Sequence, residues 1–279
     1  MTICSNCGRE LPDSGQPDRQ CPECRALLAA RAQGQVAPTR RSRALERMPI
    51  TTAIIAVNLL VFAAMTLSGV SPATPQVGQL IHWGANYGRD TLSAQPWRLL
   101  TANYVHIGIL HIALNMWCLW NLGALAEQVF DRWTYFLTYT ACGIAGSITS
   151  LWWHPLGVGA GASGAIFGLA GALIAALYLG RLPIPRRALQ PTLKSLLAFA
   201  GYNLVFGTVI PAIDNSAHLG GLVSGLILGT VLARHLTSLP EVRNAWRRWV
   251  FIATAIFLLL AFHFVRHTTQ LSSTLAGFS

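Results

Sequence analysis

Seven apolar stretches dominate this 279-residue sequence and restrict its fold more than any other feature. Each stretch lacks Asp, Glu, Lys and Arg and is long enough to cross a hydrocarbon layer of about 30 Å. Inside a membrane, the backbone polar groups of such a segment are satisfied when it forms a helix. We therefore predict an all-α, polytopic membrane helical bundle with spans near residues 50–67, 107–126, 133–153, 162–180, 195–212, 216–233 and 249–265.

The basic residues predict how this bundle is oriented. The formal net charge is +10, although only 11% of the residues are charged, against roughly 25% in a typical soluble domain. With a cytoplasmic N-terminus, 17 of the 20 Lys and Arg residues lie inside, and only Arg89, Arg98 and Arg266 lie outside. Because Lys and Arg concentrate in cytoplasmic loops, we predict this orientation. The positive charge then reflects topology and contact with the lipid bilayer, and we expect no nucleic-acid partner.

Four cysteines near the N-terminus form two pairs, Cys4-x2-Cys7 and Cys21-x2-Cys24, separated by 13 residues. Four thiolates can hold one tetrahedral zinc ion, and the metal can order a short segment that lacks a hydrophobic core. Disulfides are disfavoured in the cytoplasm, which leaves reduced, unstructured cysteines as the alternative. We predict a zinc-ribbon-like segment at 1–25 with a structural zinc ion and a role in docking a cytoplasmic partner.

The rest of the chain divides into a tether and a membrane domain. Residues 26–49 are rich in Ala, Arg, Gln and Pro and form the predicted basic tether, followed by the transmembrane domain at 50–265. One connection in that domain, 68–106, is far longer than a usual loop. We expect this loop to have structure or function of its own, and His106 to help hold it.

A serine and a histidine near the starts of two spans are the first candidate functional pair. Ser163 lies in the Gly161-Ala-Ser-Gly164 sequence, and its hydroxyl is a potential nucleophile if a base is close. His218 precedes a stripe of small residues, Gly221, Gly225 and Gly229. Such stripes allow close approach of helix backbones. Packing of the two spans at their glycines would bring Ser163 within hydrogen-bond reach of His218.

His111 and Asn115 extend the candidate site. They are four residues apart and share one face of the second predicted span. In the predicted orientation, the spans that carry His111, Ser163 and His218 all enter from the outer face, so these residues lie at similar depth. Ionisable residues in a membrane are costly and usually functional. The structural alternatives are a hydroxyl bonded to its own helix, a histidine bonded to a carbonyl, and an asparagine that joins helices.

These motifs together resemble the rhomboid family of intramembrane serine proteases. The resemblance covers about residues 50–234 and includes the Trp97–Arg98 pair before the second span and Glu127 after it. It implies a six-helix rhomboid-like core, with a seventh transmembrane helix beyond it. It also implies a structural role for Glu127. We expect the Trp97–Arg98 pair to position the long loop against the lipid boundary, with simple interfacial anchoring as the alternative.

The resemblance also implies a catalytic dyad without a cofactor. Ser163 is the nucleophile and His218 is the general base. Asp214 is assigned to the loop before the sixth span, so no carboxylate orients His218. The Asn115 side chain, His111 and the Ser163 backbone N–H then stabilise the oxyanion. The site lies toward the outer face, and the substrates are transmembrane proteins.

Two readings from other classes stay open. A catalytically silent rhomboid-like protein would bind membrane clients without cleaving them, although such a protein is expected to lack the serine or the histidine. A metal or proton transporter would use His111 and His218 as ligands. The sequence offers no third acidic or histidine partner at their depth, although His106 is close.

We expect purified full-length protein to contain about one zinc ion per chain, because four thiolates complete one tetrahedral site. Replacing Cys4 or Cys24 with Ser should remove that zinc, as measured by elemental analysis. Replacing Cys118, which lies in a predicted span, serves as the control and should leave the zinc content unchanged. Zinc that persists in the Cys4 and Cys24 variants, or that is absent from the unmodified protein, would contradict the predicted site.

Overall fold

The computed structural model of the chain describes residues 2–3, 10–11, 21–22, 25–26, 48–180, 184–210 and 213–276, of which 2–3, 10–11 and 271–276 are described by their backbone alone. The chain divides into two units, Met1–Arg47 and Met48–Ser279. In the first unit, strands β1 (Thr2–Ile3) and β2 (Glu10–Leu11) pair antiparallel, and Cys21 is buried. The predicted zinc ligands Cys4, Cys7 and Cys24 lie outside the described residues, so the zinc site stays a prediction.

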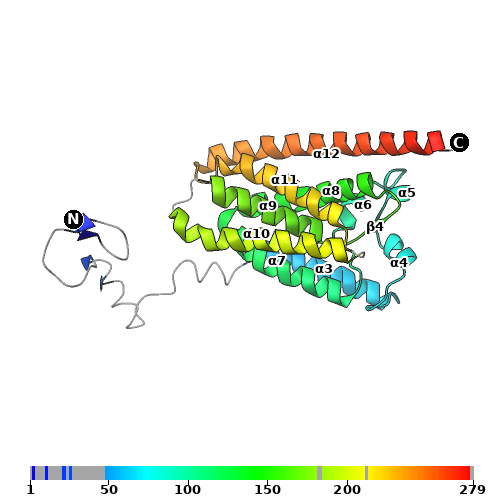
Figure 1. Ribbon diagram of the computed structural model, residues 1–279, viewed down its shortest axis with the longest axis horizontal. Helices are drawn as coiled ribbons and strands as arrows, with labels where there is room; N and C mark the ends of the chain where they lie inside the picture. The colour runs from blue at the N-terminus through cyan, green and yellow to red at the C-terminus, as the bar shows by residue number, and fades with distance from the viewer. Residues whose placement is uncertain are drawn as a thin grey trace. The chain divides into compact units, whose positions relative to one another are not determined.

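The second unit is a bundle of long helices (Figure 1). One such helix corresponds to each predicted span, and the predicted all-α bundle with a six-helix core and a seventh helix is confirmed. The long helices are α3 (Pro49–Leu67), α7 (Ile109–Val129), α8 (Arg132–Trp153), α9 (Ser163–Leu179), α10 (Arg186–Val209), α11 (Asn215–Ala233) and α12 (Pro240–Ala276).

Among the described residues, four helices are long and apolar enough to cross a membrane: α3, α7, α11 and α12. The apolar helix α9 is shorter, with 17 residues. Two helices extend well beyond the predicted spans, because the prediction followed the uncharged run rather than the helix. The helix α10 begins at Arg186 rather than near 195, and α12 includes charged turns on both sides of 249–265.

The long connection between α3 and α7 contains structure of its own, as expected. It holds α4 (Val77–His82), β3 (Asn86–Tyr87), α5 (Gly88–Thr91) and α6 (Arg98–Thr101). Strand β3 pairs antiparallel with β4 (Val158–Gly159), which lies between α8 and α9. These elements gather at one end of the bundle, which we call the loop end (Figure 1).

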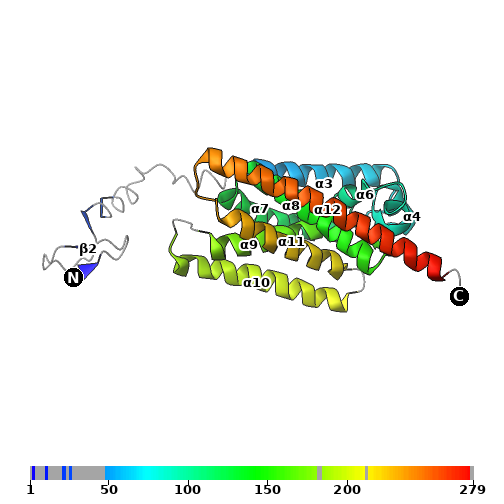
Figure 2. The ribbon, with the colours of Figure 1, turned by 90° about the horizontal axis from the view of Figure 1, so that it is seen from above.

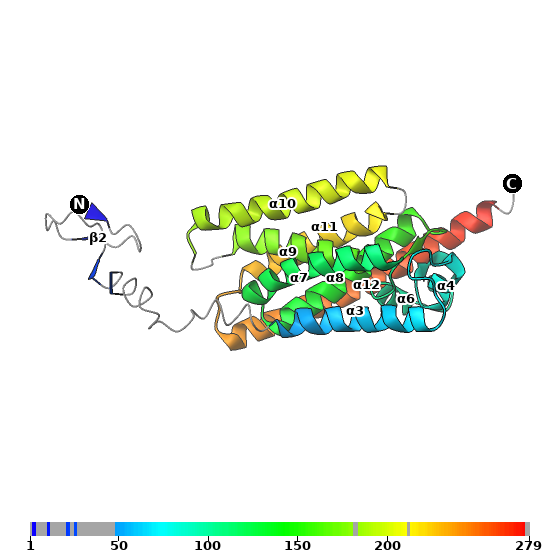
Figure 3. The same cartoon turned by 90° about the horizontal axis from the view of Figure 1, so that it is seen from below.

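The helix α9 forms the centre of the bundle, because 13 of its 17 residues are buried. The helices α3 and α10 lie on opposite sides of the bundle (Figure 2 and Figure 3). The helices α9 and α11 meet at small residues, as predicted. A Cβ atom added to Gly221 or Gly225 would overlap the carbonyl oxygen of Gly164 or Gly168, respectively. Side chains larger than hydrogen therefore do not fit at these positions.

A carboxylate from α7 caps the start of α3. The Glu127 Oε1 atom accepts hydrogen bonds from the backbone N–H of Thr51 at 2.8 Å and from its hydroxyl at 3.0 Å. That hydroxyl lies 3.2 Å from the Tyr135 hydroxyl of α8. The first N–H groups of a helix have no partner within the helix. Glu127 therefore satisfies one of them and links α3 to α7 and α8.

The helix α12 is held against α8 at two levels. Asp131 caps α8 by accepting from the N–H groups of Trp133 and Thr134, and the Arg247 guanidinium of α12 donates to the same carboxylate at 2.6 Å. Nearer the loop end, an apolar cluster joins the two helices to the long loop. Its buried members are Leu92, Leu99, Ile148, Leu151, Phe262 and Val265.

Replacing Glu127 with Ala should lower the free energy of unfolding by about 1.5–3 kcal/mol, because two hydrogen bonds to a charged acceptor are lost. Gln128→Ala is the matched control, since the Gln128 side chain is exposed and bonds only within α7. Equilibrium unfolding in mixed detergent micelles measures both variants. Equal stability of the two variants would contradict the capping role of Glu127.

Candidate functional site

The helices α7, α9 and α11 all begin near the loop end, and each carries one predicted site residue in its first turn. Ser163 is the first residue of α9, His111 is the third of α7, and His218 is the fourth of α11. These three residues, which we predicted to lie at similar depth, are therefore all found near the loop end of the bundle.

The backbone before Ser163 is held in an unusual conformation. Gly161 has a φ of 126°, a value that side chains disfavour. A Cβ atom at Gly161 would lie 2.6 Å from Cε1 of His111 and 2.9 Å from its Nε2 atom. The Gly161 N–H donates to the carbonyl of Ala102 at 2.9 Å. Glycine at this position thus lets the start of α9 lie directly against the His111 ring.

His218 is buried where α9 and α11 face each other. Its ring stacks on Phe167, with ring centroids 4.2 Å apart and the planes inclined by 14°. Phe167 lies one turn after Ser163 on α9, and Gly221, three residues after His218, meets the carbonyl of Gly164. The two predicted dyad residues therefore lie on facing surfaces of tightly packed helices.

The described structure does not join these two side chains by a hydrogen bond. No described residue forms a hydrogen bond with the Ser163 hydroxyl. The buried Nδ1 atom of His218 likewise has no hydrogen-bond partner in the described part of the chain. Catalytic hydrogen bonds are often long or poorly aligned before substrate binds and tighten in the complex. The packing thus brings the helices together but leaves the Ser163–His218 bond unmade.

The hydrogen bonds of His111 determine which ring nitrogen carries its proton. The Ile107 N–H donates to Nδ1 of His111 at 3.3 Å. In a neutral imidazole one nitrogen accepts and the other carries hydrogen, so the proton lies on Nε2, which faces Gly161. The Asn115 amide donates one hydrogen to the His111 carbonyl at 2.9 Å and has a second hydrogen available. Both side chains can therefore donate to a ligand.

A small cavity of about 30 Å³ lies beside the serine. This volume is enough for about one or two water molecules. Its wall is polar and rich in glycine, and it includes Asn86, Asn103, Ser147, Ser150, Ser163 and Asp214. The cavity gives the hydroxyl of Ser163 access to a space where water can be held.

His106 positions the start of α9, a role that the sequence suggested only for the loop. It is fully buried. Its Nδ1 atom lies 3.2 Å from the Tyr104 carbonyl, and its Nε2 atom accepts from the Ala162 N–H at 3.4 Å. Burial, and then the neighbouring His111, lower the pKa of His106 to about 3. The neutral ring therefore ties the long loop to the residue before Ser163.

The predicted position of Asp214 in the loop needs refinement. Asp214 is the N-cap of α11, and it accepts from the Ala217 N–H at 3.0 Å. Its other oxygen accepts from the Ser150 hydroxyl of α8 at 2.5 Å. The spacing between Asp214 and Ala217 is typical of an N-cap, and this sequence signal was available. The sequence contains no comparable signal for the hydrogen bond between Asp214 and Ser150, which are 64 residues apart.

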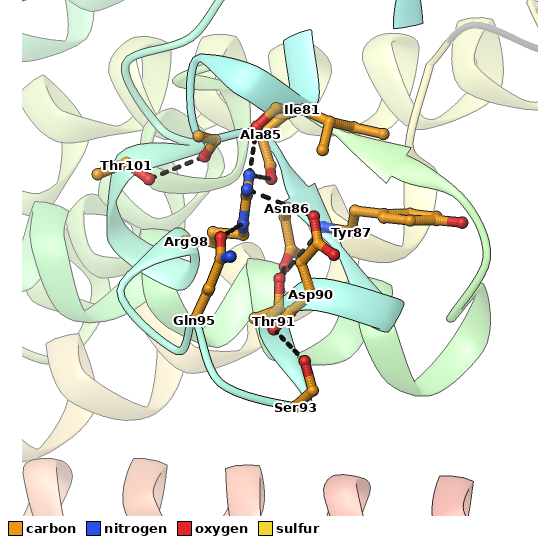
Figure 4. Close-up of polar contacts among 11 residues, drawn as sticks. Ile81, Ala85, Asn86, Tyr87, Asp90, Thr91, Ser93, Gln95, Arg98 and Thr101 are labelled. Carbon is orange, nitrogen blue, oxygen red and sulfur yellow. Dashed lines mark hydrogen bonds and ion pairs between the residues drawn. The ribbon is translucent and has the colours of Figure 1, made fainter. Parts of the chain in front are cut away.

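Arg98 holds the long loop together, as expected (Figure 4). Its side chain is buried and donates to the carbonyls of Ile81 and Ala85. It also donates to Gln95 at 2.7 Å and pairs with Asp90 at 3.3 Å. One side chain thereby satisfies several groups of the loop, and all of the partners named here lie within that loop, away from Ser163.

The apolar helices and the polar groups at their starts define an integral, multi-pass membrane protein. Residues 93–235, just over half of the 279 residues, match the Rhomboid domain. This chain belongs to the rhomboid family.

Three relatives show how far the similarity extends. The chain is 34% identical over 212 residues to Rhomboid protease GluP of Bacillus subtilis (strain 168), with 76% of this chain and 39% of that protein covered. It is 33% identical over 174 residues to RHOMBOID-like protein 7 of Arabidopsis thaliana, with 62% of this chain and 53% of that protein covered. It is 30% identical over 193 residues to Rhomboid-like protease 1 of Toxoplasma gondii, with 68% of this chain and 64% of that protein covered. The chain thus spans less than two thirds of each relative.

Gly161→Ala should lower the free energy of unfolding by about 1–3 kcal/mol, because the new methyl group meets the His111 ring at a strained φ. Gly201→Ala in α10 is the control, since nothing lies within 4 Å of a Cβ atom there. That variant should be neutral or more stable by about 0.5–1 kcal/mol. Equilibrium unfolding in mixed detergent micelles measures the free energy of unfolding of both variants. Similar changes in that free energy at both positions would contradict the close contact at Gly161.

Proposed function

We propose that this protein is an intramembrane serine endopeptidase that hydrolyses peptide bonds in or next to transmembrane segments of membrane proteins. The observation that supports this proposal most is the packing of α9 on α11 at Gly164 and Gly221. This packing orients the turn that carries Ser163 toward the turn that carries His218. Membership of the rhomboid family and the similarity to Rhomboid protease GluP point in the same direction.

In the proposed reaction, the Ser163 oxygen attacks the scissile carbonyl carbon while His218 takes up the hydroxyl proton. The carbon–nitrogen bond then breaks, and His218 returns the proton to the leaving amine. Water attacks the resulting ester, again with His218 as base, and releases the second product. The Ser163–His218 hydrogen bond has to form when substrate binds, since the unliganded geometry lacks it.

The tetrahedral intermediate needs donors for its negatively charged oxygen. The Nε2 proton of His111, the second amide hydrogen of Asn115 and the backbone N–H of Ser163 are the proposed donors. The last of these is available because it lies at the start of a helix. No cofactor is needed for these steps.

We also propose the orientation and the accessory metal site that the sequence predicts. The distribution of Lys and Arg supports a cytoplasmic N-terminus and a site toward the outer face. Thiolates of Cys4, Cys7, Cys21 and Cys24 would hold structural zinc, and the segment would dock a cytoplasmic partner. The burial of Cys21 fits a ligand at the centre of such a segment.

The second candidate function is a catalytically silent protein that binds membrane clients. The observation that favours it is the missing hydrogen bond between Ser163 and His218 in the described structure. Both residue types needed for hydrolysis are present, which favours the protease.

A serine-reactive phosphonate should label the unmodified protein, because the attacking hydroxyl is activated by His218. Ser163→Ala should abolish labelling, and His218→Ala should slow it by about 10³-fold or more. Ser224→Ala is the matched control, since the Ser224 hydroxyl in α11 bonds to the Gly221 carbonyl. Gel fluorescence and mass spectrometry of the labelled peptide provide the measurement.

Two outcomes decide between the candidate functions. Labelling that persists in Ser163→Ala would remove this residue as the nucleophile. An unmodified protein that neither reacts with the phosphonate nor cleaves any membrane protein, yet retains bound membrane proteins on purification, would favour the silent client-binding protein.

A further inference from the structure

A second, larger cavity lies at the loop end next to the serine. Its volume is about 640 Å³, within the range of ligand-binding pockets. It shares two lining residues, Ser150 and Asp214, with the small cavity at Ser163. Apolar side chains form much of its wall, among them Ile107, Trp153, Val158, Ile213 and Leu219. A chain segment that lies in this cavity is therefore adjacent to the proposed nucleophile.

A single carboxylate stands where the two cavities adjoin. One oxygen of Asp214 accepts from the Ala217 N–H and the Ser216 hydroxyl, and the other accepts from the Ser150 hydroxyl. The β4 residue Gly159 also lies close to the carboxylate, since a Cβ atom added there would be 3.4 Å from Oδ2. These contacts fix the carboxylate in position at the cavity wall.

The charge of Asp214 is not cancelled by its neighbours. All three donors are neutral groups, and no ion pair with Asp214 occurs among the described residues. Among the described residues that line the large cavity, Asp214 is the one acidic residue, none is Lys or Arg, and His154 is the other titratable side chain. The start of α11 contributes only about half a positive charge. The local potential is therefore negative.

We propose that the large cavity is a substrate subsite that selects a basic side chain, Lys or Arg, close to the cleaved bond through the carboxylate of Asp214. Apolar walls reduce the screening of the charge on Asp214. A cationic substrate side chain is therefore bound more favourably than a neutral one, and an anionic side chain less favourably. The aliphatic part of a Lys or Arg side chain also suits a wall of Ile, Trp and Leu. This inference rests on the proposed protease function.

The test uses full-length protein in lipid nanodiscs and a set of transmembrane peptides. The peptides carry Lys, Gln or Glu at each of the four positions on either side of the cleaved bond, and mixtures compete so that relative kcat/KM values are measured by mass spectrometry. We expect Lys to be preferred over Glu at least about threefold at one or more positions. Asp214→Asn should bring that ratio close to one, because asparagine still caps a helix but has no charge.

Two control variants separate charge from structure. Ser216→Ala removes a hydrogen bond to Asp214 but leaves its charge, and it should keep the Lys-to-Glu ratio. His154→Gln removes the other titratable group of the cavity and should also keep the ratio. A ratio near one in the unmodified protein, or a ratio unchanged in Asp214→Asn, would overturn the proposal.

A binding measurement separates this inference from the proposed function. The Ser163→Ala protein should bind the Lys peptide at least about threefold more tightly than the Glu peptide in fluorescence anisotropy, and Asp214→Asn in that background should remove the difference. If no peptide is cleaved but this difference is found, the subsite stands and the protease function fails. If peptides are cleaved and no such difference is found, the protease function stands and the subsite proposal fails.

Discussion

The carbonyl of Gly164 occupies the space that a side chain at position 221 would need, and the same relation recurs one turn further along at Gly168 and Gly225. In a lipid environment, association of helices depends on close van der Waals packing rather than on exclusion of water. This backbone contact places α9 at the centre of the bundle and determines which turns of α9 and α11 face each other. The relative positions of Ser163, Phe167 and His218 all follow from it.

The same contact requires the start of α9 to be fixed independently, since the first N–H groups of a helix have no partner within the helix. The structure uses the loop end for this purpose. Ala102 and His106 accept from the N–H groups of Gly161 and Ala162. Arg98 keeps the long loop compact through its own set of carbonyl and carboxylate partners (Figure 4). The loop is therefore a structural support for the turn before Ser163.

Much of this architecture could be predicted from the sequence, because its strongest signals are local. Uncharged apolar runs identified the seven long helices of the described residues, and the stripe from Gly221 to Gly229 identified the packing of α11 on α9. The runs did not reveal the charged turns of α10 and α12, since a helix can continue past the hydrocarbon boundary.

Contacts between distant residues could not be predicted. The bond between Ser150 and Asp214 joins residues 64 positions apart, and the sequence contains no periodic signal for it. The tautomer of His111 depends on the Ile107 N–H, a loop group whose position follows only from the folded loop. The missing Ser163–His218 hydrogen bond is likewise a matter of side-chain geometry that residue types and spacing do not determine.

The attachment of α12 has a consequence for how such bundles can grow. Asp131 already caps α8 within the core, and Arg247 and Arg243 of α12 use the same carboxylate. The Rhomboid domain match ends at residue 235, before α12 begins at Pro240. A helix outside the matched domain is therefore attached through a carboxylate that the core already uses as a cap, so the polar part of this contact requires only basic residues in the added helix.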